Sequence, residues 1–164
     1  RSYNIMRDKG EKDLLTGLYN RNRYERDCSR YKEWFQDSLA CVYIDANGLH
    51  ELNNSQGHEA GDRMLKMIAE QMRKRFGTQH TYRIGGDEFL AFAADQEETL
   101  VYHLGRETAE ALEQLHIHIS VGVRWKREVP SIQELVKEAE KEMYRSKKAY
   151  YEQEKNDRRK KRDF

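Results

Sequence analysis

The sequence has little cysteine and no long apolar run, and each shortage excludes a class of protein. Its only cysteines are Cys28 and Cys41. Two thiols without a secretory signal argue against a disulfide-stabilised secreted fold, and no further ligands stand at zinc-site spacing. We therefore expect free, buried thiols in a reducing cytosol. No apolar run approaches the roughly 20 residues that span a membrane, so we predict no membrane insertion of this segment.

Net charge is also nearly absent. The chain of 164 residues has 30 Lys and Arg against 29 Asp and Glu, which gives a formal net charge of +1. Such balance provides no bulk attraction to nucleic acid or to membrane surfaces, so we predict neither as a partner. The length fits one domain, and a domain near this size buries roughly 70% of its unfolded surface. We expect a cytoplasmic domain, which is compatible with a membrane anchor in a missing upstream part.

Apolar periodicity predicts an alternation of strands and helices. Residues 39–44 form a continuous apolar run that ends at Asp45, the pattern of a strand buried on both faces. Gly85 and Gly86 separate two further apolar stretches, which is typical of a hairpin turn. The predicted strands are 39–44, 80–84, 88–94 and 116–124, and the predicted helices are 20–37, 49–54, a long one from after Gly57 to Phe76, 97–115 and one that begins at Ser131.

This order of elements predicts the fold class. Strand, helix pair, strand, strand, helix, strand is the split βαβ, ferredoxin-like arrangement. The prediction is thus an α+β fold, with a central antiparallel sheet of the nucleotidyl-cyclase or polymerase-palm type flanked by helices. In it the first and third strands are antiparallel neighbours. The end of the first strand, Asp45, should therefore meet the start of the third, at Asp87 and Glu88.

Carboxylates that converge in this way require a cation or a shared proton, because they repel each other. Magnesium takes oxygen ligands and leaves room for substrate phosphates. Gly85 and Gly86 carry no side chain that would block the approach of the backbone to phosphate oxygens. Taken alone, Asp45 or Asp87 is more simply a polar residue at a strand end or in a turn. Their combination beside the two glycines predicts a metal site.

Residues 83–89, Arg-Ile-Gly-Gly-Asp-Glu-Phe, resemble the signature of the GGDEF family of diguanylate cyclases. Other segments resemble the family's opening motif, its metal-strand motif, its guanine-binding segment, and its last strand and helix. Their order and spacing agree with the family over roughly residues 11–150. These segments are 13–21, 45–49, Asn53 with 57–62, 120–122 and 139–147.

The resemblance implies two magnesium ions per active site, with manganese as an alternative. Asp45 and Asp87 would bind the metal, with the carbonyl of Ala46 as a further ligand. Glu88 would support metal binding. Asp87 would also accept the proton of the attacking 3′-hydroxyl, so Asp87 and Glu88 are the predicted catalytic residues.

The resemblance also implies how GTP is held. Asn53 and Asp62 would hydrogen-bond the guanine edge, and His58 would help to shape that pocket. Lys147 would reach the phosphates, and Arg83 would brace the turn or the phosphate region. The predicted substrate-binding residues are Asn53, His58, Asp62, Arg83, Gly85, Gly86 and Lys147.

The implied activity joins two GTP molecules into cyclic di-GMP and releases two pyrophosphates. Each domain would hold one GTP, so catalysis needs a homodimer, driven by an upstream sensory or coiled-coil region. Asp62 favours GTP alone, because adenine cannot supply the same donors. Alternatives are a catalytically weak domain that senses GTP or docks a partner, and a different palm-like cyclase or polymerase fragment.

Some positions depart from the family pattern. Many members carry an Arg-x-x-Asp product-inhibition motif where this chain has Phe76 and Gln79, so we expect no feedback inhibition through that site. His50 and Tyr151 replace a common Lys and a common Arg. Because the sequence starts with Arg, we expect a piece of a longer protein. The expected divisions are a linker helix at 1–12, the GGDEF catalytic domain at 13–152, and a basic, frayed C-terminal tail at 153–164.

Overall fold

One antiparallel sheet forms the centre of the computed structural model, which describes residues 10–162. Its strands lie in the order β2-β3-β1-β4. β1 is buried at every position, which explains its unbroken apolar sequence. β1 pairs antiparallel with β3 on one side, as predicted, and antiparallel with β4 on the other. The strands are β1 (Leu39–Ala46), β2 (Thr81–Arg83), β3 (Glu88–Ala94) and β4 (Ile119–Lys126).

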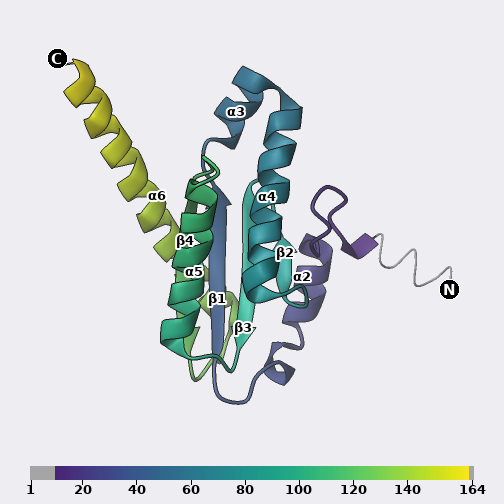
Figure 1. Ribbon diagram of the computed structural model, residues 1–164. Coiled ribbons are helices and arrows are strands. Elements are labelled where there is room, and N and C mark those ends of the chain that lie inside the picture. The colour runs from purple at the N-terminus through teal and green to yellow at the C-terminus, as the bar shows by residue number, and fades with distance from the viewer. Residues whose placement is uncertain (1–9, 163–164) are drawn as a thin grey trace.

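Helices cover both faces of this sheet (Figure 1). α4 and α5 lie side by side on one face, α2 and the first half of α6 pack on the other, and α3 stands beyond the end of β1. This arrangement confirms the predicted α+β class. The helices are α2 (Arg21–Cys28), α3 (Leu49–Gln56), α4 (His58–Phe76), α5 (Glu98–Glu113) and α6 (Ile132–Arg162).

Alternate residues of β1 serve the two layers. Val42 and Ile44 belong to the core cluster under α4 and α5, whereas Cys41 and Tyr43 belong to the cluster under α2 and α6. Successive side chains of a strand point to opposite faces, so Asp45 continues the row of Cys41 and Tyr43. The side chain of Asp45 therefore lies on the face of the sheet that α6 covers.

α6 approaches the sheet most closely at Gly122 of β4. A Cβ atom placed on Gly122 would lie 2.0 Å from the carbonyl oxygen of Ala139 and 2.3 Å from the backbone nitrogen of Met143. Real Cβ atoms do not come so close to a backbone. Glycine at this position is thus what allows the helix backbone to rest on the strand.

The predicted helix 20–37 is wrong in its length. Asn20 caps α2 as expected, by accepting a hydrogen bond from the N–H of Arg23, but the helix ends at Cys28. A 3₁₀ turn, Tyr31–Glu33, follows. The hydroxyl of Tyr31 donates to the carbonyl oxygen of Val129 at 2.7 Å. Tyr31, Trp34 and Phe35 keep the three- and four-residue spacing of a helix, but here that spacing reflects packing of the turn into the core rather than a continued helix.

The last strand and the C-terminal end also differ from expectation. β4 begins at Ile119 because His116 adopts a left-handed conformation with φ 62°, and the N–H of Ile117 still donates to Leu112 of α5. Residues 153–162, expected to be frayed, continue α6 as an exposed helix. The sequence after Pro130 contains no Gly or Pro that would end it. Most of the predicted linker helix lies outside the described residues, with only Gly10 and Glu11 visible as helical.

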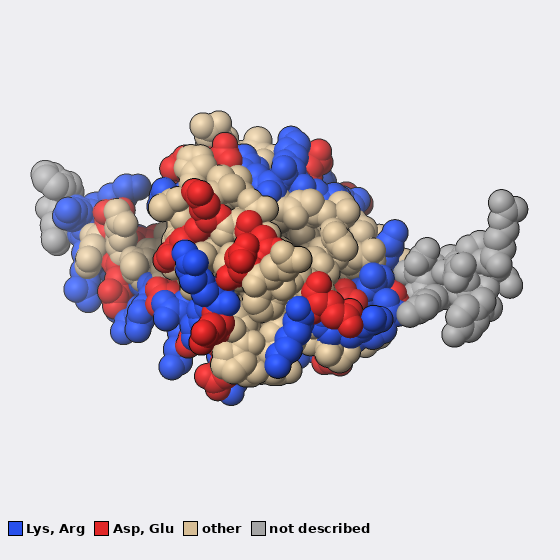
Figure 2. Space-filling view, turned by 90° about the horizontal axis from the view of Figure 1, so that it is seen from below, with Lys and Arg blue, Asp and Glu red and all other residues tan. Residues whose placement is uncertain are grey.

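Cys28 and Cys41 are buried free thiols. None of the helices found between residues 10 and 162 has the length and apolar content needed to cross a bilayer. Figure 2 shows one end of the molecule, where acidic and basic side chains are interspersed rather than segregated by sign.

Candidate metal and nucleotide site

Three carboxylates meet where β1 ends and β3 begins. Each of Asp45, Asp87 and Glu88 offers one oxygen atom, and these atoms all lie within 4.8 Å of one another. Asp45 stands opposite Glu88 in the β1–β3 register. The N–H of Ala46 donates to the carbonyl oxygen of Asp87 at 2.8 Å, which joins the strand end to the turn. Asp45 and Asp87, which are 42 residues apart in sequence, therefore meet at one end of the sheet as predicted.

Asp45 is the most enclosed of these acids, with 3% of its surface exposed. Burial raises its pKa to about 6, helped by the nearby charge of Asp87 and opposed by the ammonium of Lys147. Lys147 of α6 contacts the Asp45 carboxylate directly. Burial alone would lower the pKa of Lys147, but Asp45 outweighs it and raises that pKa. The cluster thus concentrates negative charge that a single lysine balances incompletely.

Arg83 holds the glycine turn in place. Its guanidinium donates to the carbonyl oxygen of Gly86 at 2.7 Å and to Asp13 at 3.1 Å. Thr16 donates to the same Asp13 carboxylate from its backbone N–H and its hydroxyl, at 2.9 and 2.6 Å. Burial would raise the pKa of Asp13, but these hydrogen bonds and the Arg83 charge hold it below its ordinary value. The loop that opens the domain is therefore tied to the turn beside Asp87.

The predicted guanine contacts lie apart from the carboxylates, on α3 and α4. Asn53 is half-buried. Its Oδ1 is the buried polar side-chain atom that has no hydrogen-bond partner within residues 10–162. A Cβ atom on Gly61 would lie 1.8 Å from this Oδ1, so glycine makes room for the amide. Asp62 and His58 are exposed on the first turns of α4. Asn53 and Asp62 are thus brought to neighbouring helices.

Three further positions singled out in the sequence make contacts within the chain. Lys147 contacts Asp45, although the sequence suggested a role toward phosphates. His50 lies 3.2 Å from the amide of Asn54. Tyr151 stacks edge-on against Tyr150, with ring centroids 5.4 Å apart.

Sequence reasoning missed Tyr43 and Asp13. The hydroxyl of Tyr43 donates to Oε2 of Glu88 at 3.1 Å. The sequence contained a usable signal for Tyr43, because residues two apart on a strand share a face and Tyr43 stands two residues before Asp45. The ion pair of Asp13 with Arg83 joins residues 70 apart and had no comparable signal.

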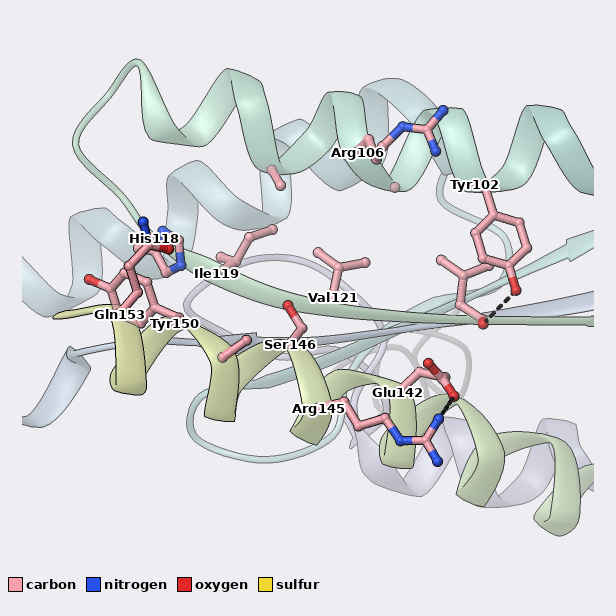
Figure 3. Close-up of a pocket in the computed structure, with 14 residues that line it drawn as sticks. Tyr102, Arg106, His118, Ile119, Val121, Glu142, Arg145, Ser146, Tyr150 and Gln153 are labelled. Atoms are coloured by element: carbon pink, nitrogen blue, oxygen red, sulfur yellow. Dashed lines mark hydrogen bonds and ion pairs between the residues drawn. The ribbon is translucent and has the colours of Figure 1, made fainter. Parts of the chain in front are cut away.

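A separate hollow of about 690 Å³ opens between α5 and α6 over the edge strand β4 (Figure 3). Ile119 and Val121 form its floor. At one end the hydroxyl of Tyr102 donates to the carbonyl oxygen of Val123 at 3.2 Å. The hollow faces the edge of the sheet, and the carboxylate cluster does not line it.

Comparison with known proteins identifies similar sequences. The family model described as "Diguanylate cyclase, GGDEF domain" matches residues 11–153. The cyclic di-GMP phosphodiesterase PdeB of Shewanella oneidensis is 36% identical over 140 residues, which cover 78% of this chain and 16% of that protein. The diguanylate cyclase DgcS of the same organism is 27% identical over 82% of this chain and 49% of its own length. The chain therefore spans about half or less of these curated relatives.

Solved structures agree in fold. The coiled coil and GGDEF domain of DgcB from Caulobacter crescentus, in complex with c-di-GMP, superposes with a TM-score of 0.81 at 19% identity. The match covers 90% of this chain and 86% of that one. A sensory box/GGDEF family protein from the same organism gives a TM-score of 0.69 at 28% identity, over 85% of this chain and 99% of that one. The predicted fold is confirmed.

Proposed function

We propose that this chain, which belongs to the GGDEF domain family of diguanylate cyclases, condenses two GTP molecules into cyclic di-GMP and two pyrophosphates. The observation that carries the proposal is the convergence of Asp45, Asp87 and Glu88 within 4.8 Å at one end of the sheet. The family model and the match to part of a longer diguanylate cyclase support membership of the family. The proposal extends the activity of that family to this chain.

The donor set fits magnesium or manganese. Carboxylate and carbonyl oxygens are the ligands these hard cations prefer, and burial beside Asp87 makes the Asp45 carboxylate costly to keep charged without a cation. Asp45, Asp87 and the carbonyl of Ala46 would hold the metal, with Glu88 in support. When bound, two such ions would activate the attacking hydroxyl and stabilise the charge of the leaving pyrophosphate.

The side chains of the domain would then act on the substrate. Asp87, in the turn just before β3, would accept the proton of the 3′-hydroxyl. Lys147 would exchange its contact with Asp45 for the triphosphate, which its long and partly exposed side chain can reach. Arg83 would keep the glycine turn in shape by holding the carbonyl of Gly86.

Guanine recognition would fall to Asn53 and Asp62. The unpaired, buried Oδ1 of Asn53 requires a donor, and the guanine edge offers N–H groups. Asp62 would accept from the guanine N1–H and the exocyclic amine. Because adenine lacks this pair of donors, ATP would leave the carboxylate unpaired and be rejected.

Two copies of the domain are required by this chemistry. Each copy supplies one guanine site and one carboxylate cluster, and the two bound GTP molecules attack each other. We propose a homodimer with facing half-sites, held together by a region upstream of the domain. The DgcB structure contains a coiled coil together with its GGDEF domain, and a coiled coil is a segment that can pair two chains.

The test is product formation from GTP. The chain, alone and fused to a dimerising helix, is incubated with GTP and magnesium, and the products are separated by anion-exchange chromatography. We expect cyclic di-GMP from the fused dimer and its loss in Asp87→Asn. Asp157→Asn, on the exposed end of α6, is the matched control and should keep the activity. A folded dimer that makes no cyclic di-GMP at saturating GTP would refute the proposal.

A GTP-binding or partner-docking module is the second candidate. The relative PdeB is named for phosphodiesterase activity, so a segment similar to this chain occurs in a protein with a different named activity. GTP binding without product in the same assay would favour this candidate. A different palm-like cyclase or polymerase fragment is no longer an alternative, because the GGDEF family model covers residues 11–153.

A further inference from the structure

Tyr43 brings a buried hydroxyl to the carboxylate cluster. The residue lies on β1 with 3% of its surface exposed. Its partner across the β1–β3 register is Leu90, two residues from Glu88 on the same strand face. The hydroxyl donates to Oε2 of Glu88 at 3.1 Å. A purely apolar residue would fill this place in the core, so the hydroxyl is the feature that needs a reason.

Glu88 is held from several directions. Its backbone carbonyl accepts from the N–H of Ile84 at 3.0 Å, which fixes the strand start. A Cβ atom on Gly85 would lie 3.2 Å from Oε2 of Glu88, so the carboxylate rests against the bare glycine. The Tyr43 hydroxyl contacts the same oxygen. Together these contacts fix a long side chain that would otherwise rotate freely.

We propose that Tyr43 is a positioning residue that orients the Glu88 carboxylate for cation binding, an inference that rests on the proposed metal site. A hydroxyl bonded to one lone pair leaves the other lone pairs of the carboxylate for a cation. Without it, Glu88 must be ordered when the cation binds, at a cost in side-chain entropy. Loss of such an outer hydrogen bond to a metal ligand typically weakens metal binding 10–100-fold.

A competing role for the hydroxyl involves Glu140. This acid of α6 also faces the Tyr43 hydroxyl, and a hydroxyl has one proton to donate. If the bond to Glu140 were the one that matters, Tyr43 would fasten α6 to the sheet and have no bearing on the cation. Glu140→Gln separates the two roles, because its uncharged amide oxygen is a weaker acceptor than the carboxylate and Glu88 stays intact.

The test measures Mn²⁺ binding directly, without nucleotide, by the electron paramagnetic resonance signal of the free ion. Tyr43→Phe removes the hydroxyl and keeps the ring, and we expect a Kd about tenfold higher than that of the unaltered chain. Tyr31→Phe is the matched control, because it removes another buried tyrosine hydroxyl, the one bonded to Val129. Tyr31→Phe and Glu140→Gln should both bind Mn²⁺ within twofold of the unaltered chain.

Two results would overturn the inference. One is a Tyr43→Phe chain that binds Mn²⁺ as tightly as the unaltered chain, and the other is an equal loss in Glu140→Gln. An unaltered chain that binds no Mn²⁺ would refute the metal site and this inference together. Mn²⁺ binding without cyclic di-GMP synthesis would refute the proposed enzyme and leave the role of Tyr43 standing, provided that Tyr43→Phe shows its expected loss.

Discussion

Gly122→Ala tests whether α6 rests on β4 as closely as the structure shows. The added methyl would lie 2.0 Å from the carbonyl oxygen of Ala139 and 2.3 Å from the nitrogen of Met143. Ordinary contacts of this kind begin near 3.5 Å, so the helix backbone must retreat by roughly 1 Å or more. Both obstacles are backbone atoms, which cannot rotate away.

The expected loss of stability lies at the upper end of the range caused by overpacking a core. Inserting a methylene into a well-packed core costs about 1–3 kcal/mol, and a clash with helix backbone leaves no cheaper adjustment. We expect the free energy of unfolding to fall by about 3 kcal/mol, which lowers the Tm by roughly 6–12 °C for a chain of this size. Lys147 lies on the displaced helix, so its contact with Asp45 should loosen as well.

The assay is thermal and urea unfolding followed by circular dichroism. Gly105→Ala on α5 is the matched control, because its methyl would meet only side-chain atoms, the nearest a Val123 methyl at 3.2 Å. Its helix propensity gain of up to about 1 kcal/mol should offset that contact. A Gly122→Ala chain that melts within 1 °C of the unaltered chain would refute the close seating of α6.

Further outcomes are expected at Asp13 and Asp62. Because the pKa of Asp13 is held below its ordinary value near 3.8, its stabilising contribution is complete above that pH and disappears as pH falls through the folded-state pKa. Asp13→Asn should therefore lower the free energy of unfolding by roughly 1–2 kcal/mol at pH 7 and by progressively less below pH 4, as measured by urea unfolding across pH. If the variant and the unaltered chain still differ by the same free energy at pH 2.5, that result would contradict the ion pair with Arg83. Asp62→Ser should admit ATP and yield a mixed dinucleotide with GTP, detected by chromatography, whereas loss of all nucleotide binding would show that Asp62 does more than select the base.

The sheet and the carboxylate cluster could be predicted because their signals are local. An unbroken apolar run that ends in an acid marks β1, and two glycines followed by Asp87 and Glu88 mark the hairpin. Their meeting follows from the antiparallel pairing of neighbouring strands, which the order of elements predicts. The roles of the individual residues in catalysis stay predictions.

The features that could not be predicted depend on contacts between distant segments. The segment after Cys28 keeps helical spacing of aromatics, yet the core and the Tyr31 bond to Val129 favour a 3₁₀ turn. The contact of Lys147 with Asp45 joins residues 102 apart. By contrast, the continuation of α6 to Arg162 was foreseeable, because no breaker follows Pro130.

The location of a bound cation tests the central claim most directly. Crystals of the chain grown with Mn²⁺ and a non-reactive GTP analogue would give an anomalous scattering peak that marks the metal. We expect this peak between the carboxylates of Asp45 and Asp87, with Lys147 released from Asp45. A peak elsewhere, or none while Lys147 still contacts Asp45, would contradict the claim that these acids hold the metal for GTP.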